Sequence, residues 1–100
     1  MENKYKELLK YSNPSIVKHK LNKYMGTPTE LFVSSRNDKK YMIKTPDDRW
    51  VHFGQMKYSD YSKHQDDNRR RNYLLRASNI KGDWKSNKYS PNNLSMNILW

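Results

Sequence analysis

The sequence predicts a small α+β domain, and three observations carry this prediction. The chain has 100 residues, the length of one domain. Its N-terminal part has apolar residues at helical spacing, whereas residues 30–54 form short runs rich in β-branched and aromatic side chains. A helix with an acidic start and a basic body follows. We therefore predict a single domain over residues 1–100, with a helical N-terminal arm over 1–28 and an α+β core over 29–100.

Two short helices are predicted in the N-terminal arm. The first covers residues 2–11 and has an apolar side made of Tyr5, Leu8 and Leu9. Asn13 and Pro14 fit the cap and the first position of a second helix, because the missing N–H of proline costs nothing there. Helical spacing then continues to Gly26, where this element ends.

A three-stranded antiparallel meander is predicted next, from the runs LFVSSR, KKYMIKT and RWVHFG within residues 30–54. An Asn-Asp pair and a Pro-Asp-Asp triplet separate these runs, and both are suited to tight turns. Alternation places Tyr41 and Ile43 on one face of the second strand. We expect Gly54 to permit a sharp exit from the third strand.

A basic helix and an extended C-terminal segment complete the predicted fold. Asp66 or Asp67 is the expected cap of a helix that runs to about Ser78. The chain then ends in Ile-Leu-Trp, although chain ends are usually polar and frayed. We therefore expect residues 85–100 to pack back on their own sheet, in preference to docking on a neighbouring subunit.

Composition narrows the classes of function. The net charge is +10, and each half of the chain carries an excess of five positive side chains, so the whole domain attracts anions. The absence of Cys excludes disulfides, thiolate zinc sites and Cys nucleophiles. No apolar run approaches the roughly 18 residues that a membrane span needs, and the N-terminus is too polar for a signal peptide. We expect an intracellular protein without a membrane partner.

The second half of the chain carries the pattern HFG-x4-DY-x2-H-x-D-x2-RR-x2-Y-x2-R, followed by a Trp and a closing LW. Its positions are His52-Phe53-Gly54, Asp60-Tyr61, His64, Asp66, Arg69-Arg70, Tyr73, Arg76, Trp84 and Leu99-Trp100. With the upstream KKYMIK strand, the pattern resembles a family of short basic proteins of large DNA viruses and some phages, over about Lys39 to Trp100. The resemblance implies a viral origin and a small α+β fold. It implies no activity, because that family is uncharacterised. For a viral protein we expect a location in the infected cell or the virion.

Nucleic-acid binding is the leading functional hypothesis. The expected phosphate-binding side chains are Arg69, Arg70, Arg71, Arg76, Lys81 and Lys85. Aromatic residues interleave with these cations and are suited to stacking on unpaired bases, namely Tyr58, Tyr61, Trp84 and Tyr89. Phosphate contacts position a protein without reading bases, so we expect sequence-independent, salt-sensitive binding, to DNA before RNA.

Two other functions stay open. A minor capsid or shell-linking protein would use the same charge on acidic protein surfaces, with viral capsid or core proteins, or a second copy of the chain, as partners. A metal-dependent nuclease would draw on His52, Asp60, His64, Asp66 and Asp67. No spacing typical of a metal motif is present.

A structural interpretation of the same residues is simpler than a catalytic one. Asp60 and Asp66 cap turns in this interpretation, and His64 and the arginine pair join them in charge-assisted hydrogen bonds. We therefore expect no enzyme, no catalytic or metal-binding residue and no cofactor. The residues assigned mainly to architecture are His52, Phe53, Tyr61, His64, Tyr73 and Trp84.

Overall fold

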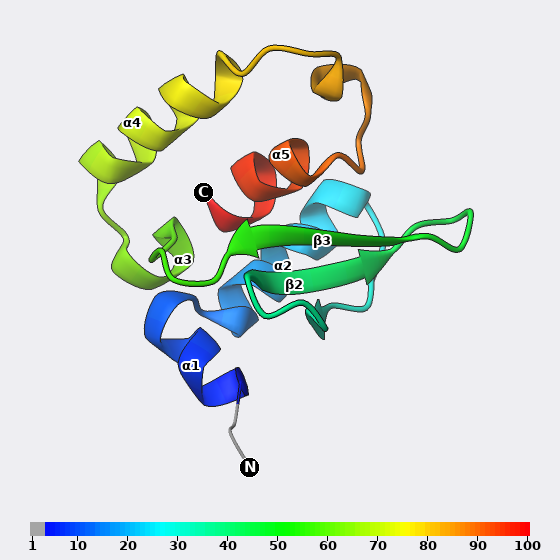
Figure 1. Ribbon diagram of the computed structural model, residues 1–100, viewed down its shortest axis with the longest axis horizontal. Helices are drawn as coiled ribbons and strands as arrows, with labels where there is room; N and C mark the ends of the chain where they lie inside the picture. Colours follow the sequence, from blue (N-terminus) through cyan, green and yellow to red (C-terminus); the bar gives the residue numbers. More distant parts are fainter. Residues whose placement is uncertain (1–3) are drawn as a thin grey trace.

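A three-stranded antiparallel sheet forms the middle of the structure, a computed structural model that describes residues 4–100 (Figure 1). Strands β1 (Phe32–Val33), β2 (Lys39–Lys44) and β3 (Trp50–Gln55) pair in the order β1-β2-β3. Their register places Tyr41 opposite Phe53. This confirms the predicted α+β class and the antiparallel meander, although the first strand is shorter than expected.

Helices precede and follow the sheet. They are α1 (Lys4–Tyr11), α2 (Pro14–Met25), α3 (Tyr61–His64), α4 (Asp67–Ser78), a 3-10 turn η1 (Trp84–Ser86), α5 (Pro91–Leu94) and a π-helical turn η2 (Ser95–Leu99). In Figure 1, α4 lies at the edge of the molecule, and α5 lies between it and β3. Among residues 4–100, no helix is both long and apolar enough to cross a membrane.

The two N-terminal helices form largely where the sequence predicts them. The Asn13 side chain accepts hydrogen bonds from the backbone N–H groups of residues 15 and 16, and Gly26 ends α2 in the left-handed conformation. Positions 2 and 3 of the first predicted helix lie outside the described residues. The predicted apolar side of α1 is wrong in part: Leu8 is buried, whereas Tyr5 and Leu9 are exposed, because only one side of this short helix meets the core.

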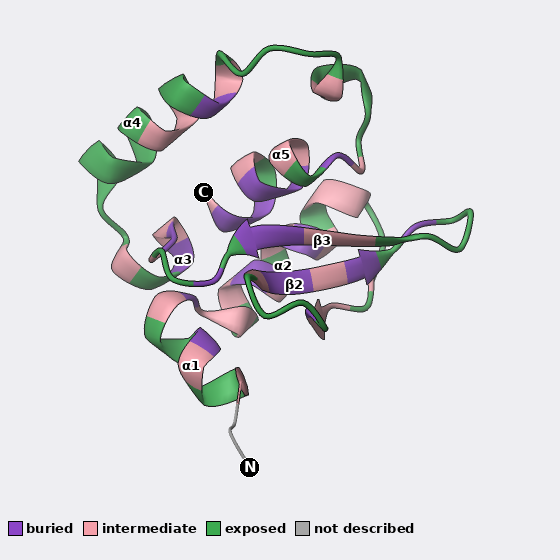
Figure 2. Cartoon of the chain, viewed as in Figure 1, coloured by how far each residue is buried: buried purple, intermediate pink, exposed green. Residues whose placement is uncertain are grey.

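The hydrophobic core joins all parts of the chain. Its buried members are Leu8, Val17, Leu21, Tyr41, Ile43, Phe53, Met56, Leu94, Ile98 and Leu99. They come from both N-terminal helices, from one face of the sheet and from the C-terminal segment. Figure 2 shows buried stretches on β2, β3 and α5, and both α5 and η2 contact β3. The N-terminal helices therefore contribute to the same core as the sheet.

The C-terminal segment packs back on the core as predicted, but it is helical and not extended. Ser90 accepts a hydrogen bond from the backbone N–H of Asn93, and Pro91 occupies the first helical turn. Leu94 and Ile98 are four residues apart, so a helix turns both toward the core. The predicted extended form is wrong because this cap and this spacing favour a helix.

Gly54 lies inside β3 and does not end it, so the predicted exit at this residue is wrong. Its φ is +86°, a left-handed conformation that glycine adopts without strain. A Cβ atom at this position would lie 2.8 Å from Cδ1 of Leu99 and 3.3 Å from Cβ of Lys40. A side chain at position 54 would therefore collide with Leu99 of the C-terminal helical turn.

Replacing Gly54 with alanine should destabilise the protein by about 2–4 kcal/mol, because backbone strain and overpacking add together. Gly26→Ala is the matched control, since φ there is +77° but no atom lies within 4 Å of the added Cβ. Urea unfolding of both variants measures the difference. Equal losses of stability in the two variants would contradict the close packing of Leu99 on Gly54.

Candidate nucleic-acid interface

A concave groove of about 810 Å³ lies between α4 and the sheet. One side is formed by α4, through Arg69, Asn72, Tyr73 and Arg76. The strand ends and the following loop supply Lys39, Gln55, Tyr58 and Ser59, and the C-terminal segment supplies Ser95, Leu99 and Trp100. Basic side chains from both the helix and the sheet line this hollow.

One face of α4 lines the groove, and the residues on this face follow helical spacing. Arg69 and Arg76 are seven residues apart, with Tyr73 between them, so all three lie on the same side of the helix. The side chain of Asp66 accepts hydrogen bonds from the N–H groups of Asn68 (3.0 Å) and Arg69 (3.2 Å). This confirms the predicted helix and its acidic cap.

Few apolar contacts hold α4, since Ala77 is its only buried residue. Tyr73 stacks on Trp100 with ring centroids 4.3 Å apart and 9° between the planes. The Asn92 amide donates to the carbonyl oxygen of Ala77 (3.0 Å), and Arg70 Nε donates to that of Trp100 (2.6 Å). The C-terminal segment thus fixes α4 along its length, while most of the helix remains exposed (Figure 2).

The four predicted arginines of α4 do not share one surface. Arg69 and Arg76 line the groove. Arg70 and Arg71 line a separate hollow with Leu74, Leu75 and Met96, on another side of the helix. Arg70 is also occupied, because its guanidinium lies 5.4 Å from the centroid of the Tyr61 ring and its Nε bonds to Trp100. Only half of the predicted arginine cluster therefore belongs to the groove.

Neither of the two predicted lysines lines the groove. Lys81 is exposed and does not line the groove. Lys85 contacts one groove residue, since its Nζ lies 5.6 Å from the ring centroid of Trp84. Trp84 lines the groove and donates from its indole nitrogen to the carbonyl oxygen of Ile80 (2.8 Å), which fixes the ring. The sequence assigns Trp84 and Tyr73 mainly to architecture, and both also line the groove.

The charged side chains that line the groove are all basic. Its basic members are Lys39, Lys40, Arg69 and Arg76, and no Asp or Glu among the described residues lines it. The side chains of Lys39, Arg69 and Arg76 make no ion pair or hydrogen bond within residues 4–100. These three cations are therefore available to an anion that enters the groove.

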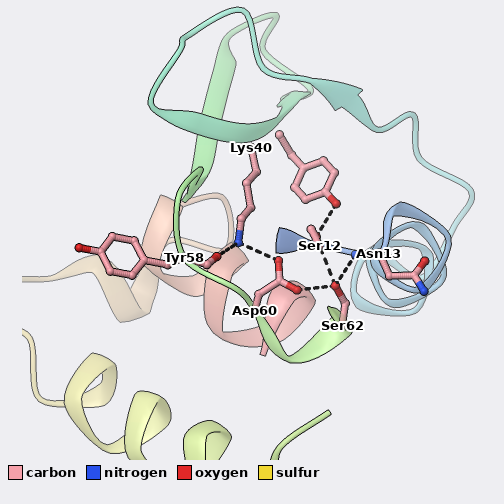
Figure 3. A network of polar contacts seen from close by, with 7 residues as sticks. Ser12, Asn13, Lys40, Tyr58, Asp60 and Ser62 are labelled. Atoms are coloured by element: carbon pink, nitrogen blue, oxygen red, sulfur yellow. Dashed lines mark hydrogen bonds and ion pairs between the residues drawn. The ribbon is translucent and has the colours of Figure 1, made fainter. Parts of the chain in front are cut away.

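Lys40 differs from the other three because it is buried and paired. Its Nζ lies 3.0 Å from Oδ2 of Asp60 and also donates to the carbonyl oxygen of Tyr58 (Figure 3). Burial lowers the pKa of Lys40, and Asp60 opposes this effect. The pair fixes the loop that carries Tyr58, whose ring points away from the network and is 68% exposed at the groove.

A chain of hydroxyl contacts extends this ion pair to the N-terminal helices. Ser62 donates to Asp60 Oδ1 and lies 3.2 Å from Oγ of Ser12, which in turn lies 2.6 Å from the Tyr41 hydroxyl (Figure 3). The N–H of Asn13 donates to Oγ of Ser62 (2.9 Å). Burial raises the pKa of Tyr41 far above its ordinary value, so this hydroxyl stays protonated and donates or accepts as the network requires.

The residues that suggested a nuclease are not arranged as one site. Asp60 is fully buried and occupied by Lys40 and Ser62, and Asp66 caps α4. Nδ1 of His52 lies 2.7 Å from the Ser34 hydroxyl, in the sheet. Within residues 4–100, no group of three or more His, Asp or Glu side chains is placed to hold a metal ion.

The predicted charge-assisted hydrogen bonds of His64 and the arginine pair are wrong. His64 Nδ1 accepts from the backbone N–H of Asp66 (2.9 Å), and Arg70 bonds to Trp100. Asp60 does begin α3, but its side chain makes no capping bond because Lys40 and Ser62 occupy it. The sequence gives no sign that Asp60 pairs with Lys40, because Lys40 is far from it in the chain.

Sequence reasoning missed two groove residues and could not place a third. Lys39 and Trp100 come from opposite ends of the fold, and no local pattern links them to α4. The sequence suggests Tyr58 as a ring for base stacking, but its position in the groove depends on the loop that the Lys40–Asp60 pair fixes. Tertiary contacts alone bring these residues together.

His64 should make stability depend on pH. Its ring lies 5.1 Å from Trp100, and its Nε2 is buried without a hydrogen-bond partner among the described residues. Burial, and next Arg69, lower its pKa below the ordinary 6.5, although Asp66 and Asp60 oppose them. Below pH 6.5, His64 is thus protonated in the unfolded chain, whereas in the folded chain it stays neutral until the pH reaches its lower pKa.

We therefore expect the urea midpoint to fall as the pH drops below 6.5 toward the lower pKa of folded His64. His64→Gln should flatten this decline, and His19→Gln, a change at an exposed histidine, should leave it unchanged. An equal pH dependence in all three proteins would show that His64 is not held neutral against Trp100.

Comparison with known proteins adds the following. No curated protein and no solved structure matches the chain. Residues 29–77 are similar to a family of unknown function (DUF5754). The matched segment contains the sheet, the Lys40–Asp60 pair and the groove face of α4, and it ends before Trp84 and the C-terminal helices.

Proposed function

We propose that this protein binds nucleic acid independently of sequence, through contacts from the basic side chains of the groove to phosphates. The observation that carries the proposal is the groove itself, where Lys39, Arg69 and Arg76 lack partners within residues 4–100 and no carboxylate side chain of that region opposes them. A net charge of +10 adds a long-range attraction for a polyanion.

The proposed role is binding without catalysis. The carboxylate most central to the fold, Asp60, is enclosed by Lys40 and Ser62 and is fully buried. His64 lies against Trp100 and accepts a backbone hydrogen bond. These side chains have structural partners that account for their positions, and the groove presents cations and aromatic rings to a ligand.

The double variant Arg69→Ala/Arg76→Ala tests the proposal. It should weaken binding to labelled oligonucleotides in fluorescence anisotropy, and it should flatten the slope of log K against log salt. Loss of two phosphate contacts corresponds to a change in slope of about 1.4 for a single strand and about 1.8 for a duplex.

The matched control is Lys10→Ala/Lys23→Ala, which removes the same charge from exposed positions on α1 and α2. Lys4 is unsuitable because it donates to the carbonyl oxygens of Ser34 and Arg36. Arg70 is unsuitable because it holds Trp100. If the two double variants weaken binding equally, net charge alone would account for the binding, and the groove would have no specific role. Tighter binding to polyglutamate than to any oligonucleotide would favour an acidic protein as the partner.

A further inference from the structure

The shape of the groove favours one class of nucleic acid. Proteins that read a duplex place a convex element, such as a helix, into a major groove about 12 Å wide. Here the unpaired cations Arg69 and Arg76 line a concavity, a shape that suits a flexible single strand better than a rigid duplex. A volume of about 810 Å³ falls in the range of sites for small ligands, which suits a short stretch of a single strand.

The spacing of the cations agrees with a strand that runs along α4. Arg69 and Arg76 are seven residues apart, or about 10 Å along the helix axis. They can therefore contact different phosphates of one backbone. Lys39 is a third contact from the sheet side of the same groove.

Aromatic rings in the groove differ in whether their faces are free. Tyr73 and Trp100 stack on each other, so each has one face covered. Tyr58 is 68% exposed, and no ring contact of its side chain occurs within residues 4–100. Trp84 is half-buried, and its indole hydrogen bond to Ile80 sets the orientation of the ring. Tyr58 is thus the ring whose faces are free for a base, and Trp84, with Lys85 Nζ 5.6 Å from its centroid, is the second ring on which a base can stack.

From this combination we infer that the groove binds single-stranded nucleic acid, with bases stacked on Tyr58 and Trp84 and phosphates held by Arg69, Arg76 and Lys39. Single-strand binders combine a positive groove along the backbone with aromatic rings that stack on bases of any identity. The inference rests on the proposed function and specifies its substrate. It also explains why Tyr58, a large aromatic side chain, remains at the surface next to unpaired cations.

The test compares three probes with the same number of phosphates: an oligothymidylate, a duplex, and an abasic strand that has the backbone without bases. The intact protein should bind the oligothymidylate about tenfold or more tightly than the duplex or the abasic strand. Tyr58→Ala should weaken binding of the oligothymidylate by about 5- to 150-fold and leave binding of the abasic strand unchanged.

Tyr58→Ala should leave the fold intact, because Lys40 bonds to the backbone of residue 58 and not to its side chain. Trp84→Ala should act in the same direction, and Trp84→Phe should restore most of the affinity through its ring. Trp50→Ala is the control, since Trp50 is 45% exposed but packs against Phe32 and Lys44 outside the groove.

The outcomes separate the two proposals. Equal affinity for all three probes, with no effect of Tyr58→Ala, would overturn the single-strand inference and leave the phosphate contacts in place. A duplex bound more tightly than the oligothymidylate would also overturn it. No binding of any probe at near-physiological salt would instead remove the proposed function.

Discussion

The buried ion pair between Lys40 and Asp60 is the interaction on which the arrangement of the chain depends. Both side chains are almost fully excluded from water, at 2% and 0% exposure, so each charge relies on the other and on the hydrogen bonds around it. Removing one partner of such a pair typically costs about 3–5 kcal/mol, because the remaining charge stays buried alone. The backbone N–H of Asp60 also donates to the carbonyl oxygen of Tyr11 (2.9 Å), and Ser62 connects the pair to the α1–α2 junction. Three segments far apart in sequence meet at this point.

The fold combines a well-packed core with one largely exposed helix, α4. The sheet, α1, α2 and the C-terminal helices share one apolar core, whereas α4 buries only Ala77 and is held by the Tyr73–Trp100 stack and by hydrogen bonds. A helix with so few buried positions keeps its cations solvated and exposed. The same C-terminal segment that closes the core against Gly54 also fixes α4, so the groove lies where these two roles meet.

Local chemistry could be predicted from the sequence, and long-range pairing could not. Asn13, Gly26 and Asp66 act as helix boundaries through nearby backbone groups, and the meander follows from alternation and turn residues. The Ser90–Pro91 boundary carries the same kind of signal as Asn13–Pro14, so the C-terminal helix was within reach of the sequence. Helical spacing predicts that Arg69 and Arg76 lie on a different side of α4 from Arg70 and Arg71. It does not predict which of these two sides faces the groove, because that depends on Trp100. The pairing of Lys40 with Asp60 has no local signal.

The three tryptophans allow the most direct test of the account, because their indole N–H signals are resolved reporters in an NMR titration with an unlabelled oligothymidylate. Trp84 and Trp100 line the groove, and Trp50 lies outside it, beside Lys44. Binding in the groove predicts shifts of the Trp84 and Trp100 signals together with the backbone amides of Arg69 and Arg76, while the Trp50 signal stays in place. A shift of Trp50 with unchanged Trp84 and Trp100 would place the nucleic acid on the sheet face and contradict the account.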